Sequence, residues 1–387
     1  MGELHAEREQ RVTPLELFFD LVFVFGFTQV TTVLSEDPTW RGLGHALLLL
    51  VTLWWAWAAY AWLTNTVDPG EEAVWGSMLV AMAAMFVAAL AVPEAFGSHG
   101  VVFGAAFLLV IIMQVTLYVI AARGDPELLR AILRVMPWSL AGATLILVAG
   151  FLPAHDRVFV WLAALALALG VPLLIGLQGW RIHPAHFVER HGLIVIIAIG
   201  ESLVAIGFGA RGTGLSAGVI VAAVLGLAVA ASFWLAYFDF FPMRAAQLLA
   251  ARSGMERIAL ARDTYTYLHL PMVAGIVLFA FAVKTTLAHV GDELSVVPAF
   301  SLGGGPALFL LAYAALRFRV ARRLGGGRLT AGVACVLLIP VAMVVPALMA
   351  LALLTAVWVA LHAYELIWWR ESRAELRRPT LLGTLDQ

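Results

Sequence analysis

The sequence contains little charge, a single cysteine and a single lysine. Charged residues make up 13% of the 387 residues and hydrophobic residues 62%, whereas soluble domains carry roughly a quarter charged residues. Because Cys335 is the only cysteine, an intrachain disulfide is excluded, and its place in an apolar run predicts a buried thiol. The net charge of −1 and the lack of a basic tract predict no binding to nucleic acid. With a mean hydropathy of +0.94, the chain is predicted to lie in lipid.

Motifs of soluble enzymes are also absent from the sequence. There is no His-Glu-x-x-His, Gly-x-Ser-x-Gly, phosphate-loop or Cys-x-x-Cys pattern, so we predict no catalytic residue, no metal site and no cofactor. A cleavable signal peptide is not expected, because residues 1–12 carry mixed charges and the apolar run after them lacks an Ala-x-Ala exit. The first apolar run is therefore predicted to remain as a membrane anchor.

Long apolar runs dominate what is present. Because about 20 apolar residues cross the ~30 Å hydrocarbon core of a bilayer, we predict an all-α polytopic membrane protein with about twelve transmembrane helices. The predicted spans are 15–34, 43–64, 73–93, 101–122, 131–150, 158–177, 187–208, 215–239, 263–288, 299–317, 329–344 and 346–369. Pro340 and Pro346 interrupt the last stretch, which leaves open two helices or one broken or re-entrant helix.

The distribution of arginine predicts the topology. With the N-terminus in the cytoplasm, twenty arginines fall in cytoplasmic segments, and only Arg41, Arg157 and Arg211 fall outside. This bias follows the positive-inside rule and favours an even number of crossings, with both termini cytoplasmic. The chain then divides into a cytoplasmic segment, two transmembrane halves and a cytoplasmic tail, at 1–14, 15–177 (spans one to six), 187–369 (spans seven to twelve) and 370–387.

The two halves show a weak internal similarity. Polar and aromatic residues recur at matching places in spans one and seven and in spans two and eight: Glu16 to Gln29 against Glu189 to Ser202, and Trp57 and Tyr60 against Trp234 and Tyr237. A parallel duplication of six plus six helices would explain this similarity, and transporters use that architecture.

Local patterns predict one helix start, one kink and two turns. Ser253 and Glu256 have the spacing of a capping box, which predicts that the ninth helix begins well before residue 263. Pro271 then lies inside this long helix and is expected to kink it. The glycine-rich stretches 303–306 and 325–327 are typical of hinges or turns.

Glu16 and Asp20 lie one helical turn apart at the start of the first predicted span. Thr13 and Glu16, with Pro14 between them, have the pattern of a capping box, which gives Glu16 a structural interpretation. Asp20 is not explained by capping, because it lies about 6 Å further into the membrane. A carboxylate at hydrocarbon depth costs a few kcal/mol or more, so it usually faces the protein interior and often has a function.

Glu201 is a second acidic residue in the membrane, in the seventh predicted span. It lies about 21 Å along the helix from residue 187, in the outer half of the hydrocarbon, and must be protonated, paired or facing water. A protonated Glu201 that is hydrogen-bonded across a helix contact is the structural alternative, and Ser202 follows it. Glu189 and Arg190 are predicted either as an ordinary interfacial ion pair or as part of a charge network with Asp20.

Other polar residues gather towards the predicted cytoplasmic side, namely Asp239, Asp263, Tyr267, His269, His362 and Glu365. They are candidates for the same network, which could hold the helices together, relay a proton or bind a cation. Asp239 could instead meet Arg244 in water, and His269 could bond a carbonyl that Pro271 leaves free.

Lys284, near the outer end of the ninth span, invites comparison with a lysine that holds retinal as a Schiff base. A charged end that reaches the outer surface, or an ion pair with Glu94, explains this lysine equally well.

Four segments resemble the bacterial low-temperature-requirement protein A (LtrA) family. They read VTPLELFFDLVFVF at 12–25, ERHGL at 189–193 with IGES at 199–202, YFD at 237–239, and HLPMVAGI at 269–276. The resemblance covers essentially the whole chain, with one departure at His191, where the family pattern has an aromatic residue. It implies a multi-pass protein of the bacterial plasma (inner) membrane, named for growth in the cold, without a settled biochemical activity.

These observations leave three functions open. The leading hypothesis is a secondary transporter or ion-coupled permease for an unknown small solute or ion, with Asp20, Glu201 and Ser202 in the pathway and Arg190, Asp239 and His269 in support. Glu16, Glu189, Tyr267 and Glu365 would assist these residues. The alternatives are a non-transporting protein that senses or organises lipid in the cold and an intramembrane enzyme for a lipid-soluble substrate. The lipid bilayer is a partner in all three, and the sequence leaves homo-oligomerisation open.

Overall fold

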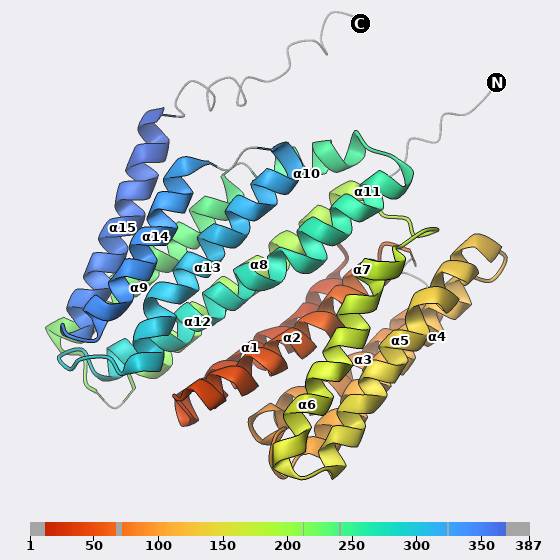
Figure 1. The fold of residues 1–387 in the computed structure, drawn as a ribbon, viewed down its shortest axis with the longest axis horizontal. Helices are drawn as coiled ribbons and strands as arrows, with labels where there is room; N and C mark the ends of the chain where they lie inside the picture. The colour runs from red at the N-terminus through yellow and green to blue at the C-terminus, as the bar shows by residue number, and fades with distance from the viewer. Residues whose placement is uncertain (1–11, 67–71, 212, 240, 323–324, 369–387) are drawn as a thin grey trace, which may run out of the picture.

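The computed structural model describes residues 12–66, 72–211, 213–239, 241–322 and 325–368, and over these ranges the chain is almost entirely helical (Figure 1). The helices are α1 (Pro14–Glu36), α2 (Trp40–Leu63), α3 (Glu72–Ala91), η1 (Val92–Glu94), α4 (Gly100–Ala121), α5 (Pro126–Phe151), α6 (Ala154–Leu165), η2 (Ala166–Gly170), α7 (Val171–Ile175), α8 (Pro184–Gly209), α9 (Ala217–Phe238), α10 (Phe241–Ala250), α11 (Gly254–Ala261), η3 (Arg262–Tyr267), α12 (His269–Ala288), α13 (Val296–Ala321), α14 (Gly326–Ala342) and α15 (Ala347–Trp368). No β-strand is present in the described ranges, which agrees with the predicted all-α class.

Eleven segments of the described chain are long and apolar enough to cross a membrane. The α6–η2–α7 run forms one of them, and the α11–η3–α12 run forms another of 35 residues. The predicted eleventh span, 329–344, corresponds to α14, which has 17 residues and is about 26 Å long at ~1.5 Å per residue. The last apolar stretch therefore forms two separate helices, α14 and α15, that pack against each other.

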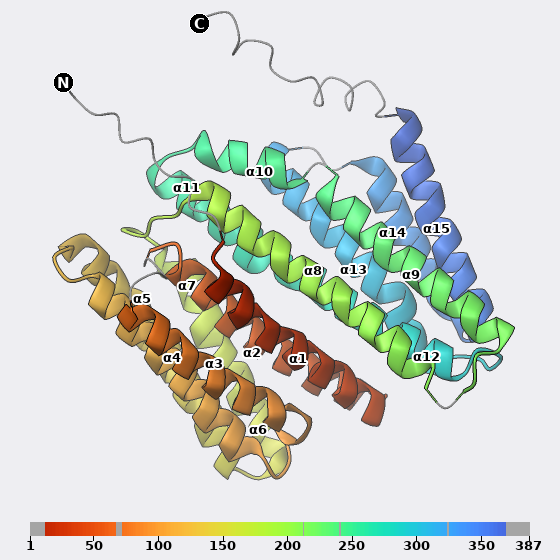
Figure 2. The same ribbon diagram turned by 180° about the vertical axis from the view of Figure 1, so that it is seen from behind.

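The helices form two groups. Figures 1 and 2 show α1 to α7 on one side and α8 to α15 on the other, and α1 packs against α8 and α12 where the groups meet. Helix α1 begins and α15 ends towards the same face of the bundle. The α1–α8 contact is therefore the natural place to look for residues shared by both halves.

Helix α12 begins after an irregular turn, as the proline within it led us to expect. Pro271 has no N–H to donate to the carbonyl four residues before it, and the preceding turn, η3, is a π-helix over Arg262–Tyr267. The helix upstream starts at Gly254, close to the predicted place, but Ser253 makes no side-chain capping bond and Glu256 pairs with Arg252 at 3.0 Å. The predicted capping box is therefore wrong, although the helix start is confirmed.

Glycines 303–305 are helical, so the predicted hinge at 303–306 is wrong. They lie inside α13, where small residues let the backbones of neighbouring helices approach closely. A Cβ at Gly305 would come within 2.6 Å of the carbonyl oxygen of Gly275 in α12, and a Cβ at Gly303 within 2.5 Å of that of Cys335 in α14. The second glycine stretch does mark a turn, because Gly325 has a φ of 67° at the start of α14.

Candidate functional site

Helices α1 and α8 run side by side and present buried acidic and basic residues to each other. Helix α1 starts with the predicted capping box: the Glu16 backbone N–H donates to Thr13 Oγ1 (3.3 Å), and the Thr13 N–H donates to Glu16 Oε2 (2.8 Å). Because the box fixes the first turn, Glu16 and Asp20 both point into the protein, with 0% and 1% of their surface exposed. Glu16 therefore caps the start of α1 and also faces α8, so its capping role does not exclude it from the predicted charge network.

Four residues form what we call the arginine cluster: Glu16 and Asp20 of α1 with His186 and Arg190 of α8. Arg190 Nη2 lies 3.1 Å from Asp20 Oδ1, and Arg190 Nε lies 3.8 Å from Glu16 Oε1. His186 Nε2 lies 3.1 Å from the same Glu16 oxygen. All four side chains are buried, so Arg190 is not part of an interfacial pair with Glu189, which is exposed and accepts the Val12 N–H at 3.2 Å.

An indole N–H completes the contacts of the Asp20 carboxylate. Trp57 of α2 donates from Nε1 to Asp20 Oδ1 at 3.0 Å. The other carboxylate oxygen, Asp20 Oδ2, has no hydrogen-bond partner among the described residues, and neither have Arg190 Nη1 and His186 Nδ1. Buried polar atoms are nearly always paired, so the arginine cluster has unused capacity for a proton, a cation or a polar solute.

Aromatic and histidine side chains surround the arginine cluster on the α12 side. His191 follows Arg190, bonds the Phe187 carbonyl through Nδ1 (2.8 Å), and contacts the ring of Trp57 at 4.9 Å between centroids. Although His191 departs from the family pattern, it thus keeps the ring contacts of an aromatic residue. His269 lies 5.5 Å from it, ring to ring.

His269 bonds a backbone carbonyl, but that of Thr264 and not the carbonyl of Tyr267 that the missing N–H of Pro271 would leave free. Its Nδ1 lies 2.8 Å from the Thr264 carbonyl, which can only accept, so Nδ1 carries the proton. Nε2 then accepts from the Tyr237 hydroxyl at 2.9 Å. His269 therefore lies beside the arginine cluster, with its ring against that of His191, the residue that follows Arg190.

Glu201 belongs to a second group, the hydroxyl cluster, which it forms with Thr28 and Thr31. Thr28 Oγ1 lies 2.5 Å from Glu201 Oε2, and Thr31 Oγ1 lies 2.6 Å from Oε1. Each hydroxyl also lies within bonding distance of a backbone carbonyl, that of Val24 (3.1 Å) or of Thr28 (2.9 Å). A hydroxyl has only one proton to donate, so a protonated carboxyl supplies a donor that an ionised one lacks.

Lys284 of α12 is the basic residue near the hydroxyl cluster. It interacts electrostatically with Glu201 and Glu36, and its ammonium group lies 5.9 Å from the centre of the Phe208 ring. Sequence reasoning considered Glu94 as the partner of Lys284 and missed Thr28. In the sequence, the only sign of the threonines was a pair of hydroxyl residues three positions apart on α1.

Ser202 is buried beside Glu201, and its hydroxyl has no hydrogen-bond partner among the described residues.

An apolar layer separates the two clusters. Between Asp20 and Thr28, α1 carries only apolar residues and one glycine, and residues 192–200 of α8 are apolar apart from two glycines. Phe23 and Phe27 are fully buried in this layer. From Asp20 to Thr31 the rise along α1 is about 16 Å.

The remaining predicted site residues lie elsewhere, so the predicted network forms only in part. Tyr267 donates to the Leu169 carbonyl at 2.5 Å, and Glu365 pairs with Arg328 of α14 at 2.6 Å. Asp239 is half-buried at the end of α9, and the side chain of its expected partner, Arg244, lies outside the described residues. In the described ranges, no three His, Cys, Asp or Glu side chains are grouped so that they could hold a metal ion.

Comparison with known proteins places this geometry in a family. The family model described as bacterial low temperature requirement A protein (LtrA) matches residues 11–363, which contain both clusters. An uncharacterized protein of Rhizobium meliloti (strain 1021) is 32% identical over 308 residues, which cover 76% of this chain and 74% of that protein. No solved structure matches the chain. This multi-pass membrane protein therefore belongs to the bacterial low temperature requirement A (LtrA) family.

Proposed function

We propose that the protein is a secondary transporter that couples the movement of a small solute or ion to a positive charge held in the arginine cluster. The observation that carries this proposal is the charge balance of the cluster. Two buried carboxylates, Glu16 and Asp20, face a single arginine. Neutrality in a low-dielectric interior needs one further positive charge, as a proton on His186 or on a carboxyl group, or as a bound cation.

The unused atoms of the cluster support an exchangeable occupant. Asp20 Oδ2 and His186 Nδ1 can accept from a ligand, and Arg190 Nη1 can donate to one. A group that served only to lock two helices together would be expected to satisfy all of its polar atoms. The cluster therefore suits a proton or cation that enters and leaves.

The position of the two clusters at the contact between the halves suits alternating access. Thr28 and Glu201 meet across the α1–α8 contact, and they are 173 residues apart, the same offset that separates Glu16 and Glu189. This coincidence supports the parallel repeat predicted from the sequence, with α1 and α8 as equivalent helices. In transporters built from repeats, one half moves against the other around a site at their interface. The layer that contains Phe23 and Phe27 would then close the path between the clusters.

The proposal includes an orientation of the protein in the membrane and a cellular location. The excess of arginine in the segments on one side of the predicted topology supports cytoplasmic termini and a place in the bacterial plasma (inner) membrane. Glu16 and Asp20 would then be reached from the cytoplasm, and Glu201 would lie nearer the outer surface. Glu201 would hold a proton near the outer surface and release it through the hydroxyls of Thr28 and Thr31. Asp20 would hold the positive charge near the cytoplasm.

Flux measurements on the purified protein test the proposal. Liposomes that contain the protein and the pH-sensitive dye pyranine are exposed to gradients of Na⁺, K⁺ and a panel of neutral, cationic and anionic small solutes. We expect proton or cation movement that depends on one of these gradients and is lost in Asp20→Asn. The matched control is Asp292→Asn, whose side chain is 75% exposed in the loop between α12 and α13.

Two outcomes would contradict the proposal. The first is that no gradient produces movement above that of empty liposomes, and the second is that movement is unchanged in both Asp20→Asn and Glu201→Gln. Glu256→Gln serves as the control for the second variant, because its carboxylate is 71% exposed. Folding of each variant is checked by size-exclusion chromatography before reconstitution.

A static membrane protein that senses or organises lipid is the second candidate, and the apolar layer between the clusters favours it. Its interior would stay closed to water in all conditions. Thiol labelling distinguishes the two candidates in a Cys335→Ala background, where Ser202→Cys reports on the buried site and Thr213→Cys on an exposed position. A transporter exposes position 202 to a water-soluble thiol reagent during its cycle, whereas a static protein labels only at position 213.

A further inference from the structure

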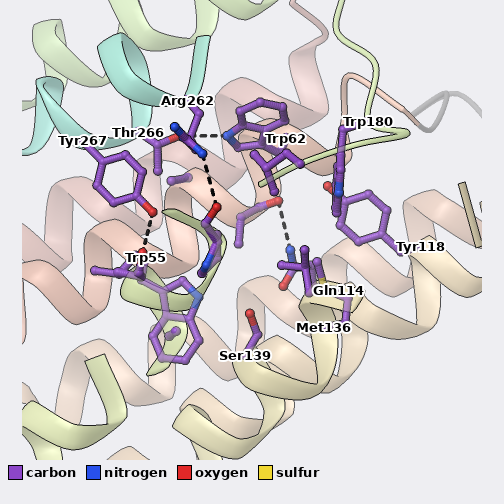
Figure 3. Close-up of a pocket in the computed structure, with 17 residues that line it drawn as sticks. Trp55, Trp62, Gln114, Tyr118, Met136, Ser139, Trp180, Arg262, Thr266 and Tyr267 are labelled. Carbon is purple, nitrogen blue, oxygen red and sulfur yellow. Dashed lines mark hydrogen bonds between the residues drawn. The ribbon is translucent and has the colours of Figure 1, made fainter. Parts of the chain in front are cut away.

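A cavity of about 80 Å³ lies between helices of the first half of the chain and η3 of the second half. Helices α2, α4 and α5 form one side, and η2, α7, the residues before α8 and η3 form the other (Figure 3). Aromatic side chains dominate its wall, with Trp55 and Tyr267 at one end and Tyr118 and Trp180 at the other. The residues of α2, α4 and α5 that line it are almost all buried, while those of η2, α7 and η3 are mostly half-exposed, so the cavity is reached from the second side.

Two π-helical turns meet at this cavity. The Tyr267 hydroxyl of η3 donates to the Leu169 carbonyl of η2 at 2.5 Å, and Arg262 Nη1 donates to the Pro172 carbonyl at 3.2 Å. π-Helical turns within α-helices are uncommon and occur frequently at functional sites. The two bonds join segments about 90 residues apart in sequence and fix the open side of the cavity.

Three buried polar groups of the wall lack a partner. Gln114 donates from its amide nitrogen to the Ala59 carbonyl at 3.1 Å, which fixes the amide and leaves Oε1 as an unused acceptor. The Tyr118 hydroxyl and Trp180 Nε1 also have no hydrogen-bond partner among the described residues. Gln114, Tyr118 and Trp180 are 2%, 0% and 6% exposed, so bulk water does not satisfy them. One acceptor, one donor and one hydroxyl that can do either therefore belong to side chains that line this cavity.

The charges beside the cavity are already paired. The Arg262 guanidinium donates to Asp263 Oδ1 from Nε (2.9 Å) and Nη2 (2.7 Å), and its Nη1 is engaged by Pro172. The wall therefore offers no free carboxylate for a cation and no free guanidinium for an anion. A neutral occupant fits this arrangement.

We propose that this cavity binds a small, neutral, planar molecule that carries both a hydrogen-bond donor and an acceptor, of the aromatic amide class. The ligand would donate to Gln114 Oε1 and accept from Trp180 Nε1, and its ring would lie among the indole and phenol rings of the wall. The cavity is smaller than the ~150 Å³ that holds a benzene, so the polar end lies inside and the rest extends through the half-exposed side. No residue of the two clusters lines the cavity, so this site does not depend on the proposed transport.

Benzamide is the probe that tests the site. The protein is labelled with 5-fluorotryptophan in nanodiscs, and the ¹⁹F resonance of Trp180 is assigned by its loss in Trp180→Phe. We expect a saturable shift of this resonance on titration with benzamide and affinity lowered about tenfold or more in Gln114→Leu, which corresponds to one lost buried hydrogen bond. Toluene, which has no polar group, and benzoate, which has no donor and a charge, are expected to bind at least tenfold more weakly.

Thr116→Val is the matched control, because its hydroxyl lies on the exposed side of α4 and bonds the Ile112 carbonyl. It should bind benzamide like the wild type. Should Gln114→Leu fail to fold, competition of benzamide by acetanilide, which keeps one N–H, and by N,N-dimethylbenzamide, which has none, tests the same hydrogen bond on the unmodified chain. The proposal is overturned if no saturable shift occurs up to the solubility limit, which means water alone occupies the cavity, or if toluene binds as tightly as benzamide.

Discussion

The arginine cluster and the hydroxyl cluster lie on the same pair of helices and bury a carboxylate in different ways. Asp20 meets a guanidinium at 3.1 Å and an indole N–H at 3.0 Å, whereas Glu201 meets two threonine hydroxyls at 2.5 and 2.6 Å. Both acids are 1% exposed, so burial does not distinguish them. The difference lies in charge: the first environment stabilises an ionised carboxylate, and the second can hold a neutral carboxyl group.

This difference predicts how each site depends on its partners. A buried ion pair is strongly destabilised when one charge is removed, because the other charge remains uncompensated. A neutral carboxyl group bonded to hydroxyls loses only hydrogen bonds, and such bonds average less than about 1 kcal/mol between membrane helices. Variants at the two sites should therefore differ by several kcal/mol in the free energy of unfolding.

Removal of the guanidinium should have the largest effect. Arg190→Ala leaves Glu16 and Asp20 buried without their arginine, and we expect a loss of about 3–5 kcal/mol in the free energy of unfolding. The measurement is reversible unfolding in mixed micelles, followed by tryptophan fluorescence. Arg181→Ala is the control, since its side chain is 70% exposed and pairs with Asp125 and Glu127 on the surface. Equal losses in the two variants would show that the arginine cluster is not an ionic site.

Removal of the indole N–H should have the next largest effect. Trp57→Phe deletes the donor to Asp20 Oδ1, and a hydrogen bond to a charged group contributes about 1.5–3 kcal/mol. Trp358→Phe is a close match, because Trp358 is also fully buried but its indole nitrogen has no hydrogen-bond partner among the described residues. Both variants lose similar packing, so the difference between them in unfolding free energy measures the bond. No difference would mean that Asp20 is not ionised.

The architecture could be predicted from the sequence because hydrophobic length determines it. Among the described residues, eleven segments are long enough to cross a membrane, and α14 is shorter, with 17 residues. The π-helical turn before Pro271 has a local cause in the missing N–H. The helical glycines at 303–305 could not be predicted as such, because their role depends on backbones of α12 and α14 that are distant in sequence.

From the sequence, only those features of the site that depend on a single helix could be predicted. The spacing of Thr13, Glu16 and Asp20 on α1 indicated a capping box and an inward-facing acid. The pairing of Asp20 with Arg190 could not be derived, because it depends on the register between α1 and α8, which the sequence of either helix leaves open. The sequence indicated Trp57 only as a residue that recurs in the second half, since nothing in α2 shows that its indole N–H meets a carboxylate.

The threonines of the hydroxyl cluster should contribute less than the indole. In the double variant Thr28→Val with Thr31→Val, Glu201 loses both hydroxyls while the volume is kept, and we expect a loss of about 1–2 kcal/mol. Thr286→Val is the control, because this buried hydroxyl bonds only the Ala282 carbonyl of its own helix. Unfolding in mixed micelles gives both values. A loss as large as that of Arg190→Ala would show that Glu201 is buried as an ion.

Replacement of the glutamate itself should have the smallest effect. Glu201→Gln keeps the shape, one carbonyl acceptor and a donor group, so a site that holds a neutral carboxyl group should change by less than about 1 kcal/mol. Glu365→Gln provides the contrast, because Glu365 pairs with the buried Arg328 at 2.6 Å and its amide would leave that charge uncompensated. If both variants lose the same stability, Glu201 is ionised and its charge is balanced by Lys284, which would make the two clusters alike. If only Glu365→Gln is destabilised, a loss of flux in Glu201→Gln can be assigned to proton exchange at that carboxyl group and not to misfolding.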